Sequence, residues 1–488
     1  MENQDKKPNI IAIIGAIVLL VLAVVGLSYA FFSAFIKNGE TDPSIEGTGA
    51  NLSLVYTDGK SVITSSNIMP GWSATKTFTV TNNGEADTYY KLNISNITNE
   101  FVDGGLTFSI ASADGGTSVA EQAVGTTTRT ISPSITIAEG ATHTYTITAK
   151  YVNLDKDQTP DLGKSFSYTI GIEASQKPTF KDIILANNEV KTPITTPGAA
   201  VSTSSEALLA SAEDDYGTSY YFRGAVTNNY VEFANKCWRI VRIGGDNTAK
   251  LILHNDNISN ASNPCSSANN STTAAFVHYD GNIYKSEFNS NYNDNAYVGF
   301  MYGTPGSTTY EATHANTNKS TILTNLETWY NNNLKTYESV IDNNVFCNDK
   351  SLSSGSGYSA NATDYAARER LYTSKIPSLK CNGELSKITS KIGLITADEL
   401  AFAGYAVRGY ITTSYLKENA TGYSWWSLSP AGFYNKSLSY VFRVRSDNDA
   451  IDICNVNVDS SVRPVISLVS SITISGVSGT SEDPYIVK

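Results

Sequence analysis

Thr75 to Gly84 read TKTFTVTNNG, and this stretch determines the fold expected for the first folded part of the chain. Phe78 and Val80 alternate with threonines, so an extended strand here would pack one face and expose the other. Asn83-Gly84 then provides a strong signal for a tight turn. Further segments with the same alternation are predicted as strands: Ala50–Tyr56, Tyr89–Ile94, Leu106–Ile110, His143–Tyr151 and Phe166–Ile172. Short strands at this spacing predict an antiparallel β-sandwich of immunoglobulin-like type over residues 45–175.

The composition favours strands, turns and a wet surface over long charged helices. Only 17% of the 488 residues are charged, and the chain contains 29 tyrosines. This length allows two or three domains, and we expect a mainly β protein with some α structure. The net charge of −11 argues against a nucleic-acid partner, because phosphate binding needs a basic face.

A long apolar run without any charged residue occupies residues 9–36. It exceeds the ~20 residues that a helix needs to cross a bilayer. Lys6 and Lys7 precede it and Glu40 follows it, which favours a cytoplasmic N-terminus and an external remainder. We therefore expect a single-pass protein of the cell membrane, with a cytoplasmic tail at residues 1–8, a transmembrane signal-anchor at residues 9–36, and extracellular domains after it.

Cleavage of this segment is a separate question. Ser28 and Ala30 are small residues placed where a signal peptidase could cut before Phe31. The apolar run is longer than the about 7–15 residues of an ordinary signal-peptide core, which favours retention as an anchor. Both outcomes stay open at this stage.

The five cysteines all lie between Cys237 and Cys454. None forms a CxxC pair and no histidine lies at metal-ligand spacing from any of them, so no metal site is expected. Cys347 and Cys381 flank a Ser/Gly/Tyr-rich loop and are the predicted disulfide. Cys237 lies in an apolar strand and could equally be a small buried core residue.

The chain changes character after the predicted sandwich. Residues 176–205 contain three prolines and a Ser/Thr/Ala-rich run, which predicts a linker. Residues 180–188 could form a short helix within it. Beyond it, strands are predicted at Tyr220–Val226, Val231–Ile243 and Lys250–His254. Residues 257–317 are rich in Asn, Ser, Thr and Tyr, and irregular stretches of this length are usually functional or mobile.

Two helices are predicted in the distal part. The first covers residues 320–330, where apolar side chains recur at helical spacing behind Ser320 as N-cap. The second begins at Thr396, which forms a capping box with Glu399. Asp398 and Glu399 are interpreted as residues that cap and solvate this helix, and they are not expected to be catalytic.

The C-terminal part is predicted to contain a hairpin. Residues 423–430, YSWWSLSP, are interpreted as a loop with buried aromatic side chains. Residues 440–447 and 451–458 follow as two strands joined by a turn at Asn448-Asp449, and residues 461–468 form a last strand. Residues 475–488 are expected to be a C-terminal tail.

The two sides of this hairpin differ in chemistry. Phe442 and Val444 fall on one face, and Arg443 and Arg445 fall on the other. Asn and Asp in a hairpin are usually turn formers, and exposed arginines are usually solvated or paired. Tyr, Asn, Ser and Arg are also the residue types that binding loops favour, so the polar side is a candidate ligand-binding face.

LSYAFFSA at residues 27–34, Ile68-Met69-Pro70-Gly71 and TKTFTVTNNG resemble the camelysin and biofilm-matrix-fibre family of Gram-positive secreted proteins. The resemblance covers residues 27–84. It implies a bacterial surface location for the β-sandwich. It leaves two roles open, a passive stalk that lifts the next domain off the membrane, and assembly into fibres by strand donation at an exposed edge.

GLITADELAFAG at residues 393–404, WWSLSP at 425–430 and VRPVISL at 462–468 resemble bacterial surface domains with a C-type-lectin-like fold. Formylglycine-generating-enzyme-like domains and the variable proteins of diversity-generating retroelements share that fold. The resemblance implies an α+β C-type-lectin-like ligand-binding domain over residues 206–474. Residues with scaffold roles would be Trp425, Trp426, Pro430, Val462, Arg463 and Pro464. Residues with contact roles would be Phe433, Tyr434, Asn435, Arg443, Arg445, Asn448, Asp449, Asp452, Asn455, Asn457 and Asp459.

Two activities of such folds are not implied. The copper-binding cysteine pair of formylglycine-generating enzymes is missing, because Cys454 is the one cysteine of the final segment. The E-P-N or Q-P-D triplet of calcium-dependent lectins is missing as well. The four histidines lie far apart without partner motifs, so neither an enzyme nor a cofactor is expected.

The sequence therefore predicts a membrane-anchored adhesin or receptor. Its distal domain would engage a protein or glycan ligand on another surface. The alternative is a structural surface or biofilm-fibre component that assembles through its β domains.

Overall fold

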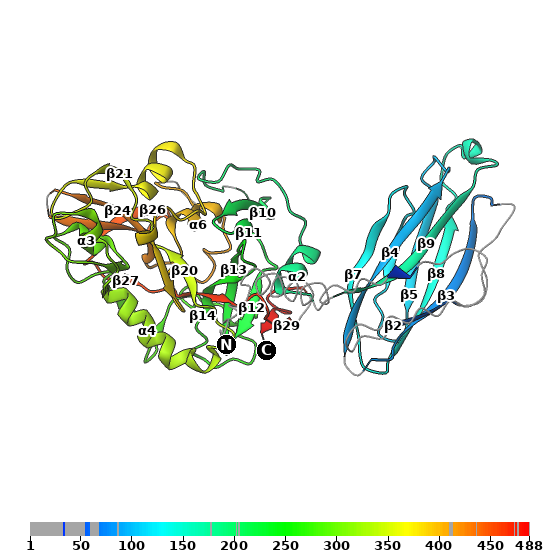
Figure 1. Cartoon of the computed structure of the whole chain (residues 1–488), viewed down its shortest axis with the longest axis horizontal. Coiled ribbons are helices and arrows are strands. Elements are labelled where there is room, and N and C mark those ends of the chain that lie inside the picture. Colours follow the sequence, from blue (N-terminus) through cyan, green and yellow to red (C-terminus); the bar gives the residue numbers. More distant parts are fainter. Residues whose placement is uncertain are drawn as a thin grey trace, which may run out of the picture. The chain divides into compact units, whose positions relative to one another are not determined.

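The computed structural model describes residues 33–34, 54–58, 68–84, 87–175, 178–201, 203, 205–408, 413–435, 437–472, 474–475 and 478–487. The protein is mainly β, as predicted. The chain divides into two compact units, residues 1–178 and residues 179–488 (Figure 1).

Most of the predicted membrane anchor, residues 9–36, lies outside the described residues, as does the predicted tail at 1–8. Ser33–Ala34 are described, and they form the short strand β1, which pairs antiparallel with β9 (Phe166–Ser175). These two residues are therefore strand, and the predicted end of the helix at residue 36 is wrong. Within the described ranges, no helix is long and apolar enough to cross a membrane.

The first unit contains two antiparallel sheets. One has the strand order β1-β9-β4-β7 and the other has the order β2-β3-β8-β5-β6. Phe78 of the second sheet and Leu92 of the first belong to the same buried core. The strands not yet defined are β2 (Leu54–Asp58), β3 (Trp72–Asn82), β4 (Thr88–Asn99), β5 (Leu106–Ser112), β6 (Val119–Ala123), β7 (Arg129–Ile137) and β8 (Thr142–Tyr151). Between β8 and β9 runs the 3₁₀ turn η1 (Thr159–Asp161).

The alternation in the sequence correctly places β2, β3, β4, β5, β8 and β9, and Phe78 and Val80 are buried as predicted. The sequence did not predict β6 and β7. Strand β7 contains Pro133, which removes a backbone donor and weakens a strand pattern. The structure accommodates it because β7 is the edge strand of its sheet and its pairing with β4 is irregular.

The second unit is built on two larger sheets. The first has the path β10-β11-β13-β12-β30-β29, and β14 joins β13 to β28. Its strands are β10 (Ala207–Asp214), β11 (Gly217–Gly224), β12 (Tyr230–Phe233), β13 (Lys236–Ile243), β14 (Ala249–Asn255), β28 (Val465–Leu468), β29 (Ile474–Ser475) and β30 (Tyr485–Val487). The second has the path β17-β27-β24-β22-β21, and β25 lies between β24 and β26. Its strands are β17 (Lys285–Ser286), β21 (Leu352–Gly355), β22 (Thr363–Tyr365), β24 (Trp425–Tyr434), β25 (Leu438–Val444), β26 (Ile451–Asn455) and β27 (Ser460–Ser461).

Helices and smaller ladders surround these sheets. The helices are α2 (Phe180–Asn187), α3 (Tyr310–Thr313), α4 (Thr321–Asn333), α5 (Ala366–Arg368), α6 (Ala397–Phe402), the π-helical turn η5 (Glu369–Ser374), and the 3₁₀ turns η2 (Ser267–Asn269), η3 (Asn295–Val298), η4 (Lys335–Tyr337) and η6 (Glu384–Ser386). The two-stranded ladders pair β15 (His278–Tyr279) with β16 (Asn282–Ile283), β18 (Met301–Tyr302) with β19 (Asn318–Lys319), and β20 (Asn344–Cys347) with β23 (Lys387–Ser390). Trp238 of β13, Trp329 of α4 and Trp425 of β24 share one buried core.

The predicted strand over residues 231–243 is in fact a hairpin. Ala234 and Asn235 have φ of 53° and 56°, and two successive left-handed residues make the tight turn that separates β12 from β13. The segment 423–430 also differs from the prediction. It enters strand β24 at Trp425, where the backbone pairs with β25 on one side and with β27 on the other.

Two segments predicted to be extended or free belong to the second unit. The short helix predicted at residues 180–188 is confirmed as α2, which begins with a capping box formed by Thr179 and Asp182. Later in the predicted linker, residues 176–205, the buried Val201 donates its backbone N–H to Gly404 O. Part of the predicted tail forms β30, which pairs parallel with β12. Both corrections have one cause, since backbone pairing with distant residues leaves little signal in the local sequence.

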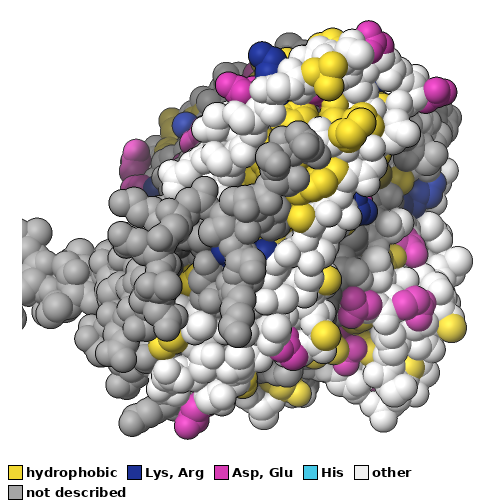
Figure 2. All heavy atoms as spheres, turned by 90° about the vertical axis from the view of Figure 1, so that its right-hand side faces the viewer, with side chains coloured by type: hydrophobic (Ala, Val, Ile, Leu, Met, Phe, Trp, Pro, Cys, Tyr) yellow, Lys and Arg dark blue, Asp and Glu magenta, His cyan; other side chains and the backbone are white. Residues whose placement is uncertain are grey.

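The predicted distal helices are α4, capped by Ser320, and α6, capped by Thr396 with Glu399. The prediction that Asp398 and Glu399 are solvated is wrong, because both are buried and both form ion pairs. Figure 2 shows charged side chains scattered over one face of the molecule. Most of the described surface on that face is white, the colour of the backbone and of side chains that are neither charged nor hydrophobic. This surface agrees with the low charge content of the sequence.

Candidate ligand-binding face

The predicted hairpin is formed by β25 and β26. Phe442 pairs with Ile453 and Val444 with Ile451, while Arg443 pairs with Asp452 on the alternate positions. Phe442 and Val444 are buried, so the packed side predicted from the sequence is correct. Strand β26 pairs with β25 alone among the described strands, and at Ile451 its other edge bonds to the backbone of residues 406–408.

Arg445 and Asp452 form the polar end of this hairpin. Arg445 Nη1 lies 3.1 Å from Asp452 Oδ2, and its Nε donates to Asp447 Oδ1 at 2.9 Å. The side chain of Arg445 is 41% exposed. The other carboxylate oxygen of Asp452 accepts from the hydroxyl of Tyr372 at 3.0 Å. Asp452 therefore links the hairpin to a residue 80 positions earlier in the chain.

Tyr372 belongs to the π-helical turn η5, a backbone form that is often found at functional sites. The guanidinium groups of Arg408 and Arg368 lie 5.0 and 5.4 Å from the centroid of its ring, within cation–π range. Burial, together with the nearby charge of Asp452, raises the pKa of Tyr372 to about 12. The phenol therefore stays protonated at neutral pH and acts as a hydrogen-bond donor.

Tyr434 extends the same cluster. Its hydroxyl donates to Asp364 Oδ1 at 2.6 Å, and Arg368 lies 5.4 Å from its ring centroid. Arg368 also forms an ion pair with Asp364 at 3.1 Å. The rings of Tyr434 and Tyr440 have centroids 5.3 Å apart. Burial, with the hydrogen bond to Asp364, raises the pKa of Tyr434.

These residues form one partly exposed cluster, which we name the tyrosine–arginine face. It consists of Asp364, Arg368, Tyr372, Arg408, Tyr434, Tyr440, Arg445 and Asp452. Arg408 is exposed, and no carboxylate in the described part of the chain forms an ion pair with it. Tyrosine and arginine held in this way provide contact area at low entropic cost.

The sequence predicted Tyr434, Arg445 and Asp452 for this face and missed the others. Arg368 and Tyr372 are four residues apart, and that spacing on a helical segment could have indicated a shared surface. Nothing in the sequence connects them with Arg408 or with the hairpin, because the contact depends on tertiary packing.

Several predicted contact residues have other roles. Phe433 is 0% exposed, so the prediction that it contacts a ligand is wrong. Its strand, β24, has neighbours on both sides, and alternation turns the ring into the core. Arg443 is half-buried and donates from Nη1 to Ser460 Oγ at 3.3 Å. It is therefore not part of the tyrosine–arginine face. Asn435 occupies the turn before β25 with φ of 56°.

The turn after β25 uses two more of the predicted residues. Asn448 Oδ1 accepts from the backbone N–H of Ala450 at 3.0 Å, and Asp449 has φ of 54°. Asp449 also forms an ion pair with Lys417 at 2.9 Å. These contacts correspond to the turn-forming role that the sequence left open.

Three predicted residues lie at or beyond the end of β26. Asn455 is opposite Tyr440 in the hairpin register, at the rim of the tyrosine–arginine face. Its side chain accepts from the backbone N–H of Asn457 at 3.5 Å. Asp459 is exposed.

The residues predicted as scaffold are buried. Arg463 donates from Nε to Leu253 O at 2.8 Å and from Nη1 to Leu416 O at 2.6 Å. The indole of Trp426 donates to Ser286 O at 2.7 Å. These bonds tie the last strands of the chain to β14, to β17 and to the loop before β24.

The predicted pair Cys347 and Cys381 is joined by a disulfide. Cys237 is not an isolated core thiol, because it forms a second disulfide with Cys265 that the sequence did not predict. Cys454 is free and buried. Among the described residues, no group of His, Cys, Asp and Glu is arranged to hold a metal ion.

The chain was compared with known protein families and with curated proteins. No family model matches the chain, and no curated protein matches it either. The case for function therefore depends on the residues themselves.

Proposed function

We propose that this chain is a cell-surface ligand-binding protein whose contact surface is the tyrosine–arginine face. The observation that supports this most directly is the position of Tyr372. Its hydroxyl is bonded to Asp452, and its ring lies beside the guanidinium groups of Arg368 and Arg408. Aromatic and arginine side chains fixed before binding lose little entropy when a ligand arrives.

The proposal includes the arrangement that the sequence predicts. The apolar run that begins at residue 9 would anchor the chain in the cell membrane, and the first unit would be an immunoglobulin-like stalk. The second unit would be a C-type-lectin-like domain that presents the face to a protein or glycan on another surface. The three motifs around residues 393–468 support this interpretation of the second unit.

A fibre or envelope component is the second candidate function. The observation that favours it is the edge of β9. Strand β1 covers only Ile172 and Glu173 on that edge, so in the described part of the chain the rest of the edge has no partner strand. Such an edge can accept a strand from another molecule.

A binding array separates the two functions. We would probe an array of glycans and bacterial and host surface proteins with the full chain and with the variant Arg408→Ala/Tyr434→Ala. We expect the variant to lose binding by at least about tenfold, because hot-spot residues contribute about 2 kcal/mol or more. The matched control is Lys335→Ala/Tyr337→Ala, which removes a basic residue and a tyrosine that are exposed elsewhere on the same unit.

The control variant should bind like the parent chain. The ligand-binding proposal would be contradicted if Arg408→Ala/Tyr434→Ala bound as well as the control variant does. It would also be contradicted if the parent chain bound no member of the array. Concentration-dependent polymerisation that stops when β9 is altered would favour the fibre instead.

A further inference from the structure

A pocket with a mixed polar and apolar lining lies in the same unit and shares no residue with the tyrosine–arginine face. The loop formed by residues 413–421 faces residues 225–227 and 270–272 across an open cavity of about 650 Å³. This volume is within the range of about 300–1,000 Å³ that is usual for small-molecule sites. The residues at 270–272 belong to the long irregular stretch, residues 257–317, that the sequence indicated as functional or mobile.

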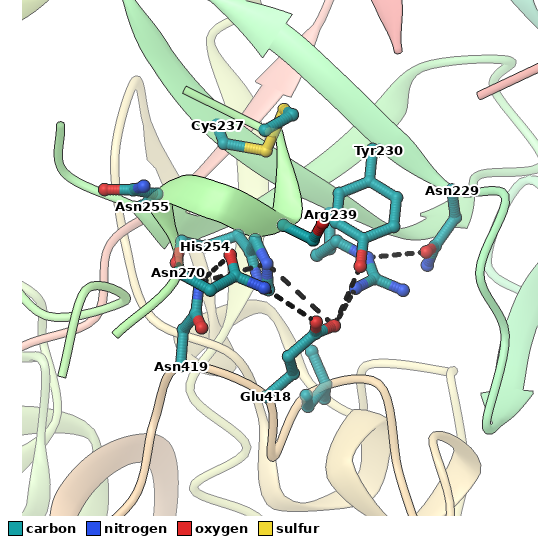
Figure 3. Close-up of polar contacts among 12 residues, drawn as sticks. Asn229, Tyr230, Cys237, Arg239, His254, Asn255, Asn270, Glu418 and Asn419 are labelled. Atoms are coloured by element: carbon teal, nitrogen blue, oxygen red, sulfur yellow. Dashed lines mark hydrogen bonds and ion pairs between the residues drawn. A yellow bond between two sulfur atoms is a disulfide. The ribbon is translucent and has the colours of Figure 1, made fainter. Parts of the chain in front are cut away.

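The carboxylate of Glu418 is held at this pocket by three donors (Figure 3). Tyr230 Oη and Arg239 Nη1 each lie 2.8 Å from Oε2, and Asn270 Nδ2 lies 3.0 Å from Oε1. The Glu418 side chain is nevertheless 40% exposed. A carboxylate has about four acceptor positions, so one remains for a ligand.

Arg239 explains why Glu418 is fixed. The Arg239 side chain is 0% exposed, and its guanidinium stacks 3.7 Å from the ring centroid of Tyr230. Its Nε donates to Asn229 Oδ1 at 2.6 Å and its Nη2 donates to Val226 O at 2.7 Å. With its donors engaged in this way, Arg239 neutralises Glu418 and leaves no free cation for an anionic ligand.

Two amide side chains lie beside Glu418. Asn419 Nδ2 lies 3.2 Å from His254 Nε2 and donates to Asn270 Oδ1 at 2.8 Å. Burial, with the charges of Arg239 and Arg463, lowers the pKa of His254 well below its usual range, so the imidazole is neutral. The amides that line the pocket beside Glu418 are therefore backed by an uncharged imidazole.

The Cys237–Cys265 disulfide stabilises the position of Asn270. It joins β13 to the loop that carries Asn270, and both sulfur-bearing residues pack against Tyr230. The residues that hold Glu418 are thus fixed by a covalent bond as well as by hydrogen bonds.

The remaining lining is rich in hydroxyl groups. Thr227, Ser271 and Thr272 are exposed, and their hydroxyls have no hydrogen-bond partner in the described part of the chain. Lys417, the one lysine of the pocket lining, is paired with Asp449 at 2.9 Å. A ligand that suits this lining has several hydroxyls and no net charge.

We propose that this pocket binds a neutral saccharide, with the Glu418 carboxylate accepting from its hydroxyls and the Thr and Ser hydroxyls completing the contacts. The methyl groups of Thr227, Ala225 and Val226 would pack on the apolar patches of the sugar ring. This site is independent of the tyrosine–arginine face.

Titration calorimetry with the full chain tests the proposal. The probes are maltotriose, N,N′-diacetylchitobiose and, as a cationic comparison, glucosamine. We expect at least one of the two neutral probes to bind, and Glu418→Gln to weaken that binding by at least about tenfold, since a hydrogen bond to a charged group contributes about 1.5–3 kcal/mol. Thr272→Val, an exposed change that should not affect folding, should weaken it by a smaller factor.

Tyr337→Phe, an exposed change on the same unit that lies outside both the pocket lining and the tyrosine–arginine face, is the matched control and should leave saccharide affinity unchanged. Binding of glucosamine alone, or no binding by either neutral probe at millimolar concentration, would overturn the proposal. Unchanged affinity in both Glu418→Gln and Thr272→Val would overturn it as well. A result of this kind would leave the proposed function untouched, because the array experiment depends on other residues.

Discussion

Two clusters of the second unit contain similar residues and differ in exposure. Around α6, Glu399 accepts from Lys250 at 2.7 Å and from Arg242 at 3.0 Å, and Arg370 pairs with Asp398 at 2.8 Å. The Glu399 side chain is only 4% exposed, and the cavity among these groups measures about 40 Å³, enough for a few waters. The tyrosine–arginine face has the same kind of charge pairing on a surface that solvent reaches.

The degree of burial, more than the residue types present, determines whether a cluster of charged side chains contributes to stability. Desolvation makes each buried charge depend on its partners, so loss of one partner is severe. Exposed pairs contribute little to stability because water and salt screen them. The exposed cluster is therefore free to serve binding, and the buried one serves the fold.

The largest expected effect is on the buried cluster. Glu399→Ala should lower the free energy of unfolding by about 3–5 kcal/mol, because it leaves Lys250 and Arg242 buried without their shared partner. Urea unfolding followed by tryptophan fluorescence measures this. A loss below about 1 kcal/mol, the value of a surface pair, would remove the distinction between the clusters.

Removal of the Cys347–Cys381 disulfide should have the next largest effect on stability. Replacing Cys347 and Cys381 together by serine should destabilise the second unit by about 2–4 kcal/mol, because the unfolded chain loses a loop closure. This disulfide lines the buried charge cavity, so its removal and Glu399→Ala disturb the same site. We therefore expect the combined variant to lose less free energy of unfolding than the sum of the two separate losses. Thermal unfolding of the single and combined variants tests this, and simple additivity would contradict it.

Acid should affect the buried cluster more than the exposed one. Burial alone would raise the pKa of Glu399, but Lys250 and Arg242 lower it from 4.5 to about 2. The stabilisation is present above the unfolded pKa and is lost as pH falls through the folded pKa, here between about pH 4.5 and 2. The loss should not exceed about 3 kcal/mol, and Glu399→Gln should remove most of this dependence. An equally steep acid dependence in Glu399→Gln would contradict this assignment.

The smallest effect on stability should come from the tyrosine–arginine face. Arg445→Ala should change the free energy of unfolding by no more than about 1 kcal/mol, because its ion pairs with Asp447 and Asp452 are exposed. The same urea experiment measures it. Destabilisation close to that of Glu399→Ala would make Arg445 a structural residue.

The sequence was sufficient wherever a local pattern controls structure. Period-two alternation located β3 with its buried Phe78 and Val80, and the capping signals at Ser320 and Thr396 located α4 and α6. These elements are predictable because propensity, capping and burial agree within a few residues.

The rest depends on contacts between distant segments. Strand β7 was not predicted because it contains Pro133. The segment 231–243 was predicted as one strand, but a turn at Ala234-Asn235 separates it into β12 and β13. Three of the eight residues of the tyrosine–arginine face, Tyr434, Arg445 and Asp452, were predicted from the sequence. Tyr372 and Arg408 were not, because only tertiary packing brings them to Asp452.

Arg408→Ala provides the most direct test of the central claim, that the exposed cluster serves binding and not the fold. The Arg408 side chain is exposed and lies beside the ring of Tyr372, and its backbone bond to Ile451 would survive the substitution. Its removal should therefore change the free energy of unfolding by no more than about 0.5 kcal/mol. Affinity for the array-identified ligand, measured on the same protein preparation, should fall by at least about tenfold. Unchanged affinity, or a loss of affinity that accompanies unfolding, would contradict the account.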